Sequence, residues 1–159
     1  MSENRQPSYG IVPMDEMREM SGLEFLRRMS TGELPLAPIS AVLRFGLTEV
    51  DSGRIVMEGT PSLDFYNPIG SVHGGYAATL LDSCMGCAVQ SLLDAGQGYT
   101  TLEFKVNFVR ALSEKTGPVR AEGKIVNAGR RIMTAEGHLT DRAGQLYAHG
   151  TTTCLVFPI

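Results

Sequence analysis

The stretch from Gly74 to Leu93 constrains this chain more than any other segment, because Asp82 is the only charged side chain within it. The other residues are mostly small or apolar and lack the alternation of a strand. Such a pattern predicts a helix that is apolar nearly all the way round and therefore buried. An ionised carboxylate is costly in a buried helix unless it is paired, neutralised or used, so Asp82 is the first candidate for a functional residue.

Composition limits the setting in which this helix folds. The chain has 159 residues, of which 43% are hydrophobic, and this suits one globular domain with a sizeable core. A net charge of -3 argues against nucleic acid as a partner. Residues 1–5 contain no apolar run of signal-peptide length and no segment is apolar enough to span a membrane, so we expect a cytoplasmic protein without a membrane partner. The odd number of cysteines, three, predicts reduced thiols.

Six segments have the composition of strands and follow one another with short connections. A hairpin is expected across Asp51-Ser52-Gly53, and the turns at residues 127–129 and 141–144 predict an antiparallel meander. The expected strands are residues 39–50, 55–61, 99–111, 118–127, 131–140 and 145–157.

The first part of the chain differs in character from the rest. Residues 14–29 carry apolar side chains at helical spacing, and Pro35 and Pro38 follow. We therefore divide the chain into a partly helical N-terminal extension, residues 1–36, and a main domain, residues 37–159.

Small residues on the later strands indicate how the sheet packs. In residues 101–108, apolar side chains at Leu102, Phe104, Val106 and Phe108 alternate with polar ones, so one face of the sheet is expected to meet a core. The inward positions of the following strands are small and leave room for a closely packed helix. They are Ala121, Gly123, Ala135, Gly137, Ala148 and Gly150. The fold class predicted is α+β, an antiparallel sheet curled around one central helix.

These features together resemble the hotdog-fold acyl-CoA thioesterases of the phenylacetic-acid-degradation, or PaaI-like, type. The likeness covers residues 39–157. It depends on Asn67, Gly70, the sequence His73-Gly74-Gly75, Asp82 and the strand at residues 99–110. It implies a hotdog fold and hydrolysis of an acyl-CoA or aryl-acyl-CoA thioester to a carboxylic acid and free coenzyme A. No cofactor is implied, because coenzyme A is part of the substrate.

Elementary chemistry gives several of the same residues a function. A helix N-terminus has unpaired amides and a positive dipole end, and Gly74 and Gly75 allow a carbonyl to approach them closely. This arrangement suits an oxyanion hole. The resemblance assigns the donor to Gly74, assisted by the side-chain amide of Asn67, with Asp82 as general base or nucleophile. A thiol leaves readily as a thiolate, so a thioester suits a lone carboxylate.

Two further residues have a catalytic and a structural interpretation. His73 either binds the thioester or fixes the loop by a backbone hydrogen bond. Thr101 occupies the position where the resemblance places a hydroxyl that holds the attacking water, with the neighbouring Thr100 as the alternative, and it is otherwise an ordinary strand threonine.

The substrate-binding candidates are apolar residues for the acyl group and arginines for coenzyme A. Phe65, Tyr66 and Ile69 are expected to line an acyl pocket together with the helix of a partner chain. Arg110, Arg130 and Arg131 are the cations available for the phosphates. Core packing and solvated turns are the alternative explanations for these residues.

The spacing of Gly74 and Asp82 predicts a homo-oligomer. Eight residues correspond to about 12 Å along a helix, whereas a base and an oxyanion donor must both lie within about 3 Å of one reacting centre. Two antiparallel copies related by a two-fold axis bring Gly74 of one chain beside Asp82 of the other. The resemblance implies the same: active sites at a dimer interface, with dimers commonly joined into homotetramers.

Two other functions are the alternatives to thioester hydrolysis. A hotdog hydratase or dehydratase would transfer protons at a β-hydroxyacyl thioester, and a non-catalytic acyl-CoA-binding protein would keep the pocket without the reaction. The spacing of Cys84 and Cys87 matches a redox pair, but both lie several turns into the helix and are expected to be core residues. We expect no metal site, because Cys154 and three scattered histidines are the ligands that remain.

Overall fold

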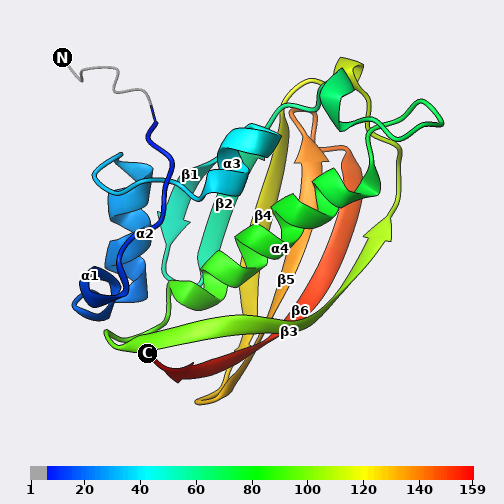
Figure 1. Ribbon diagram of the computed structural model, residues 1–159. Coiled ribbons are helices and arrows are strands. Elements are labelled where there is room, and N and C mark those ends of the chain that lie inside the picture. Colours follow the sequence, from blue (N-terminus) through cyan, green and yellow to red (C-terminus); the bar gives the residue numbers. More distant parts are fainter. Residues whose placement is uncertain (1–6) are drawn as a thin grey trace.

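The computed structural model describes residues 7–159, and an antiparallel sheet of six strands forms its main layer (Figure 1). The strand order is β1-β2-β4-β5-β6-β3. The strands are β1 (Phe45–Asp51), β2 (Arg54–Gly59), β3 (Gln97–Phe108), β4 (Val119–Ala128), β5 (Ile132–Asp141) and β6 (Leu146–Pro158). The predicted hairpin is confirmed between β1 and β2, and Gly53 in its turn has a φ of 78°, which a glycine adopts without strain. The predicted meander of β4, β5 and β6 is also confirmed.

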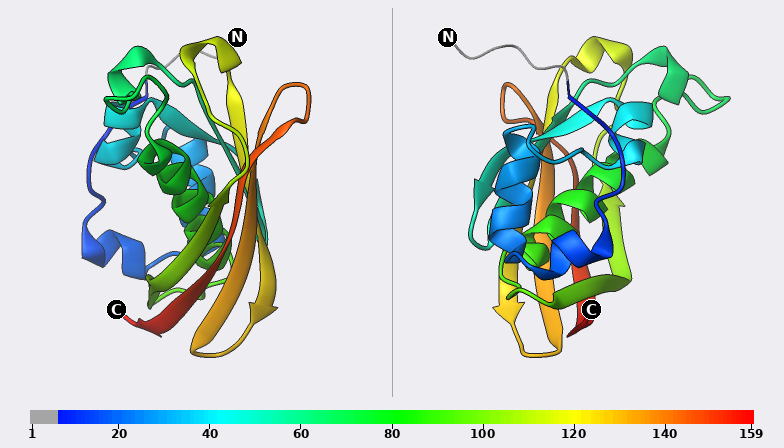
Figure 2. Two further views of the ribbon diagram at one scale, coloured as in Figure 1. Left: turned by 90° about the vertical axis from the view of Figure 1, so that its right-hand side faces the viewer. Right: turned by 60° about the vertical axis from the view of Figure 1, so that its left-hand side comes forward.

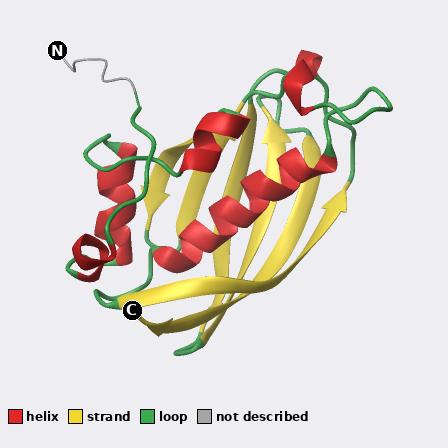
Figure 3. Ribbon diagram, viewed as in Figure 1, coloured by secondary structure: helices red, strands yellow, loops and turns green. Residues whose placement is uncertain are grey.

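One long helix, α4 (Gly74–Gln90), crosses the concave face of this sheet, and the N-terminal helices lie on the same side (Figures 1 and 2). Two short 3₁₀ turns, Leu63–Phe65 and Glu114–Thr116, lie near the start of α4. The sheet curls around α4, as the sequence predicted (Figure 3). Most of α4 is buried, as predicted, but Asp82, Ser83 and Cys87 remain partly exposed on the side that the sheet does not cover.

The small residues of the later strands explain why α4 lies so close to the sheet. Ala121 and Ala135 are fully buried beneath it. A Cβ atom added to Gly123 would lie 2.4 Å from the Cys84 carbonyl oxygen, and one added to Gly137 would lie 3.0 Å from Met85 Cγ. The predicted small patch therefore contacts the helix on β4 and β5.

Gly123→Ala is expected to destabilise the fold by about 3 kcal/mol, the upper end of overpacking costs, because the new methyl group meets helix backbone. Urea unfolding monitored by circular dichroism measures this change. Gly46→Ala on β1 is the matched control, since a Cβ there has no atom within 4 Å. Equal stability of the two variants would show that α4 does not dock as closely as described.

The alternation expected along β3 is wrong at its start. In its second half Val106 packs against the core as predicted, but Phe104 and Phe108 are 39% and 58% exposed in this chain. A β-bulge between Thr101 and Glu103 shifts the register with β6. A bulge re-aims the side chains that follow it. Thr101 therefore faces α4 and does not share the polar face, whereas Leu102, predicted to face the core, is 55% exposed.

The N-terminal segment departs from the sequence prediction in two places. Residues 14–29 do not form one helix but two, α1 (Met14–Arg18) and α2 (Gly22–Ser30), because the Ser21 side chain accepts a hydrogen bond from the Glu24 amide and caps α2. The expected strand from residue 39 begins only at Phe45. Residues before it form α3 (Pro38–Leu43), which has a proline in its first turn and ends at Arg44 with a φ of 53°.

These helices pack on the main domain through α2. Leu26 is 1% exposed and belongs to the principal core, while Val12, Met20 and Leu34 form a small second cluster. The Gly22 amide donates a hydrogen bond of 2.9 Å to the Leu93 carbonyl just beyond α4. Residues 1–6, which entered the prediction of a cytoplasmic protein, lie outside the described part of the chain. Within residues 7–159, no helix has the length and apolar character needed to cross a membrane.

The outer face of the sheet carries a network of ion pairs centred on Glu122. Its carboxylate accepts hydrogen bonds from Lys124, Arg120 and Arg54 at 2.8–3.0 Å. Burial alone would raise the pKa of Glu122, but these three cations outweigh it and lower the pKa to about 2.

This network predicts a loss of stability in acid. The folded-state pKa of Glu122 lies below the unfolded value of about 4.3, so its contribution is fully present above that value and is lost as the pH falls towards 2. The difference in unfolding free energy between the parent protein and Glu122→Gln is expected to shrink between about pH 4.5 and about pH 2. Urea titrations at several pH values measure it. A constant difference would show that the network does not depend on the charge of Glu122.

Candidate active site

Asp82 lies midway along α4 and is half-buried. The Thr101 hydroxyl on β3 donates a hydrogen bond of 3.1 Å to its Oδ1 atom. The bulge after Thr101 makes this contact possible, since it turns the threonine towards the helix. Asp82 and Thr101, both predicted as site residues, are therefore brought together with one carboxylate oxygen fixed and the other not bonded within the described residues.

The Asp82 carboxylate opens into a largely apolar cavity of about 230 Å³. The cavity is lined by Leu26, Met29, Leu36, Ala37, Ile39, Ser40, Phe45, Leu47, Met57, Asp82, Ser83, Cys87 and Tyr99. Burial raises the pKa of Cys87 to about 12 and that of Tyr99 well above its ordinary value. Both groups are therefore neutral near neutral pH, and Asp82 is the one carboxylate in this lining.

The start of α4 presents one free amide. His73 is the N-cap residue, and its Nδ1 atom accepts a hydrogen bond of 2.8 Å from the Gly75 amide. A neutral histidine whose Nδ1 accepts carries its proton on Nε2. Within residues 7–159, the Gly74 amide has no acceptor. Gly75 is thus used by the cap, and Gly74 keeps the donor that an oxyanion hole requires.

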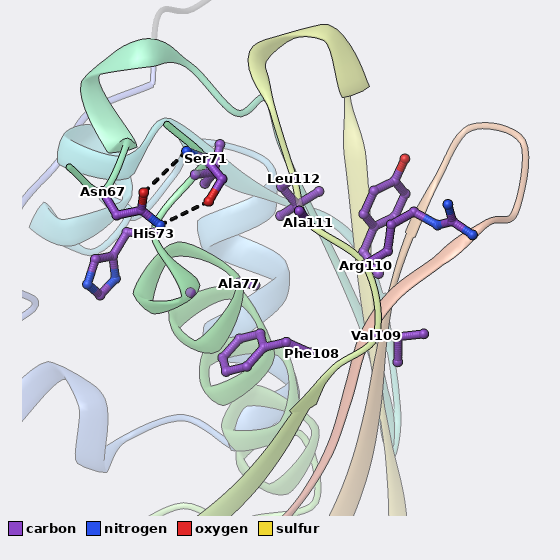
Figure 4. A pocket seen from close by; sticks show the side chains of 12 residues that line it. Asn67, Ser71, His73, Ala77, Phe108, Val109, Arg110, Ala111 and Leu112 are labelled. Carbon is purple, nitrogen blue, oxygen red and sulfur yellow. Dashed lines mark hydrogen bonds between the residues drawn. The ribbon is translucent and has the colours of Figure 1, made fainter. Parts of the chain in front are cut away.

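Asn67 organises the loop that leads into α4. Its Oδ1 accepts from the amides of Ile69 and Ser71, and its Nδ2 donates to Ser71 Oγ at 2.9 Å. Figure 4 shows the Asn67 side chain turned towards Ser71. The second hydrogen of Nδ2 has no acceptor in the described residues. The Asn67 amide therefore combines a structural bond with one remaining donor.

A second cavity, of about 340 Å³, lies at this end of the helix (Figure 4). Its lining is Asn67, Ser71, Val72, His73, Gly74, Ala77, Phe108, Val109, Arg110, Ala111, Leu112 and Tyr147. In Figure 4 the Phe108 ring points towards Ala77, whereas the Arg110 guanidinium points away from the helix start. Arg110 is the predicted phosphate-binding residue that the structure places in the same cavity as Gly74.

Gly74 and Asp82 line two different cavities of the protomer. The oxyanion donor and the base therefore do not face a common space within one chain. This geometry agrees with the separation of about 12 Å expected from their spacing on a helix.

The three predicted acyl-pocket residues take other places in the protomer. Phe65 is buried and stacks on Tyr76, with ring centroids 5.0 Å apart. The Tyr66 hydroxyl hydrogen-bonds to Glu114, and Ile69 is 87% exposed at the tip of the loop. None of the three lines either cavity described above.

Arg130 and Arg131 lie at the end of the sheet opposite to the start of α4. There they line an open groove together with the end of β6. Their part in binding coenzyme A therefore stays a prediction that needs a second protomer. Among residues 7–159, no three side chains are grouped as metal ligands.

The N-terminal residues of the Asp82 cavity were not predicted as site residues. Leu26, Met29 and Leu36 come from the extension, for which the sequence suggested no function. Their only signal was the apolar spacing of residues 14–29, which serves core packing equally well.

The curled antiparallel sheet and its single central helix define a hotdog fold. Residues 69–148, about half of the chain, match the model of the Thioesterase superfamily. The chain belongs to this superfamily, and its membership indicates thioesterase activity in the broad sense.

Individual relatives agree with this assignment. A protein of Saccharolobus solfataricus assigned as an esterase is 30% identical over 99 residues, covering 62% of this chain and 69% of that protein. The structure is also similar to a phenylacetic acid degradation-related protein of Ralstonia eutropha JMP134 assigned as a thioesterase, with 28% identity, a TM-score of 0.75, and coverage of 82% and 98% of the two chains. The PaaI protein of the E. coli phenylacetic acid degradation operon shares the fold at 18% identity, with a TM-score of 0.68 over 75% of this chain and 83% of that one.

Proposed function

We propose that the protein hydrolyses acyl-CoA or aryl-acyl-CoA thioesters to a carboxylic acid and free coenzyme A. The observation that carries this proposal is the half-buried Asp82 carboxylate, which is held by Thr101 and opens into an apolar cavity. A carboxylate retained beside an apolar cavity in a thioesterase-superfamily chain is suited to act on a thioester. The expected location in the cytoplasm remains part of this proposal.

The edge strand β3 supports a dimer with shared active sites. It forms one edge of the sheet, and its Leu102, Phe104 and Phe108 side chains are 55%, 39% and 58% exposed. A long apolar edge strand is a template for pairing with another chain. A second copy that pairs antiparallel to β3 would cover these side chains and continue the sheet.

Contacts along β3 support one register for such a pairing. Thr101 lies at the level of Asp82, and Phe108 lies against Gly74, where an added Cβ would be 3.1 Å from the ring. If Thr101 of one protomer stands opposite Phe108 of the other, Asp82 of the first comes level with Gly74 of the second. Each dimer would then hold two active sites. Further association into a tetramer is compatible with the free outer sheet face.

The reaction would proceed by attack of water on the thioester carbonyl. Asp82 takes a proton from the water as its oxygen bonds to the carbonyl carbon, and the Gly74 amide of the other protomer stabilises the resulting oxyanion. The carbon–sulfur bond then breaks, and the thiolate, whose conjugate acid has a pKa of about 8.5, leaves without a strong acid. Asp82 gives the proton to the departing thiolate or to solvent and is again a carboxylate. The Nε2–H group of His73 and the second Nδ2 hydrogen of Asn67 are further donors at the helix start.

Coenzyme A would extend from the reacting sulfur along the end of the molecule that carries Arg110. This residue lines the cavity at Gly74, and its guanidinium is exposed to solvent. An arginine binds phosphate oxygens through paired hydrogen bonds. Arg130 and Arg131 lie at the end of the sheet near the start of β3, which an antiparallel partner would bring towards Arg110 of the other chain.

Release of free thiol from a panel of acyl-CoA and aryl-acyl-CoA substrates tests the proposal. Hydrolysis of at least one member is expected. No hydrolysis at all, together with tight binding of the thioesters, would indicate a non-catalytic binding protein. Formation of an enoyl product from a β-hydroxyacyl-CoA would instead indicate a dehydratase. An acyl adduct on Asp82 detected by mass spectrometry after rapid quenching would assign it as a nucleophile.

A further inference from the structure

The N-terminal extension supplies one wall of the cavity at Asp82. Leu26 and Met29 on α2, and Leu36 in the following loop, line this cavity together with Met57 of the sheet and Asp82 itself. These three extension residues precede the superfamily match, which begins at residue 69. The wall therefore lies outside the part of the chain that the superfamily model matches.

Contacts at the start of α2 fix this wall in place. The Gly22 amide bonds to the Leu93 carbonyl at 2.9 Å, and a Cβ added to Gly22 would lie 1.7 Å from the Gln90 carbonyl oxygen. One turn later, Leu26 is buried in the principal core. Close packing at Gly22 and at Leu26 thus sets the position of Met29, which follows them on α2, relative to Asp82.

The lining selects against negatively charged acyl groups. Of its side chains, Asp82 is the one carboxylate, and no lysine, arginine or histidine is present among the described residues that line it. A second negative charge in this cavity would have no cation to pair with, which makes its burial costly. An uncharged acyl group attached to the carbonyl beside Asp82 would instead bury its apolar surface there.

The size of the cavity limits the length of such a group. A cavity of about 150 Å³ lined by apolar side chains holds benzene. The cavity here measures about 230 Å³. It has room for a single aromatic ring on a short linker or an aliphatic chain of similar volume, and a long fatty acyl chain exceeds it.

We propose that the N-terminal extension is the specificity-determining wall of the acyl pocket, that Met29 limits the acyl groups accepted to compact ones, and that the cation-free lining excludes anionic ones. This inference rests on the proposed thioesterase function, since it names the acyl class of the same site. The reacting carbonyl must lie beside Asp82, so its acyl substituent enters the cavity into which that carboxylate opens, while coenzyme A points the other way.

Substitutions at Met29 test the wall through ratios of kcat/KM between substrates. Met29→Trp, which fills the cavity, is expected to lower the ratio for phenylacetyl-CoA over acetyl-CoA by at least about tenfold. Met29→Ala, which enlarges it, is expected to raise the ratio for dodecanoyl-CoA over hexanoyl-CoA. Arg27→Ala, an exposed change on the same helix, is the matched control and should leave both ratios within about twofold.

Calorimetry with S-hexyl-CoA, a thioether without a carbonyl, separates failure of this inference from failure of the proposed function. The parent protein is expected to bind S-hexyl-CoA at least about tenfold more tightly than coenzyme A, and Met29→Trp should remove this preference. If no thioester is hydrolysed but the binding preference behaves in this way, the proposed hydrolysis is wrong and the inference that the extension forms the wall of the acyl pocket is supported. The inference is overturned if the preference is absent in the parent protein, or if Met29→Trp leaves the ratios and the preference unchanged while circular dichroism shows a native fold.

Discussion

Asp82→Asn is expected to lower kcat for acyl-CoA hydrolysis by about 10²- to 10⁴-fold, the range for loss of a general base. Asparagine has nearly the same size as aspartate and keeps an oxygen that can accept the 3.1 Å hydrogen bond from Thr101 Oγ1. The substitution therefore removes the basicity of residue 82 and preserves its position. Steady-state release of thiol from the best substrate of the panel measures the effect.

The control for Asp82→Asn is its fold and its ability to bind. Removal of a half-buried carboxylate should leave the unfolding temperature unchanged or slightly raised. Binding of S-hexyl-CoA should persist, because the apolar lining of the cavity is untouched. A folded Asp82→Asn protein that keeps more than about a tenth of the parent kcat would show that Asp82 is not the base.

Gly74→Pro is expected to lower kcat by about 10²- to 10³-fold, the cost of losing one oxyanion-hole donor. Proline lacks the amide hydrogen but is well tolerated at the first position of a helix, which Gly74 occupies in α4. The preceding residue, His73, has φ -58° and ψ 134°, an extended conformation that a following proline permits. The change thus deletes a hydrogen-bond donor with little change of backbone shape.

Gly74→Ala distinguishes loss of the amide donor from crowding by the added Cβ atom. Its methyl group would lie 3.1 Å from the Phe108 ring, a crowding that proline shares, but alanine keeps the amide hydrogen. The alanine variant should therefore retain much more activity than the proline variant. Equal losses in the two variants would assign the effect to contact with Phe108 and remove the Gly74 amide from the mechanism.

The architecture was predictable because its signals are local and redundant. The Asp51-Ser52-Gly53 turn, the uncharged run around Asp82 and the small residues of β4 and β5 each indicate one packing arrangement, and all three agree. The boundaries that failed depend on single residues. Ser21 caps a second helix, whereas the apolar spacing of residues 14–29 suggested one continuous helix. Pro38 begins a helix where a strand was expected.

The candidate site was predictable only where its residues act through backbone position or charge. Gly74 and Asp82 stand out in the sequence for these reasons, and the structure places them at the start and middle of one helix. The contact between Thr101 and Asp82 requires a β-bulge, and no residue type in β3 indicates a bulge at this position. The wall formed by Leu26 and Met29 depends on how the extension docks, a long-range contact between segments that apolar spacing alone does not pair.

Shared active sites are the central claim, and complementation between inactive protomers tests it most directly. Gly74→Pro and Asp82→Asn chains would be co-expressed with different affinity tags, and the mixed dimers would be isolated by both tags in turn. Each mixed dimer holds one site with both residues intact and one site with neither, so its kcat per dimer should recover to about half of the parent value. Mixed dimers that form but stay as inactive as either variant alone would contradict the claim.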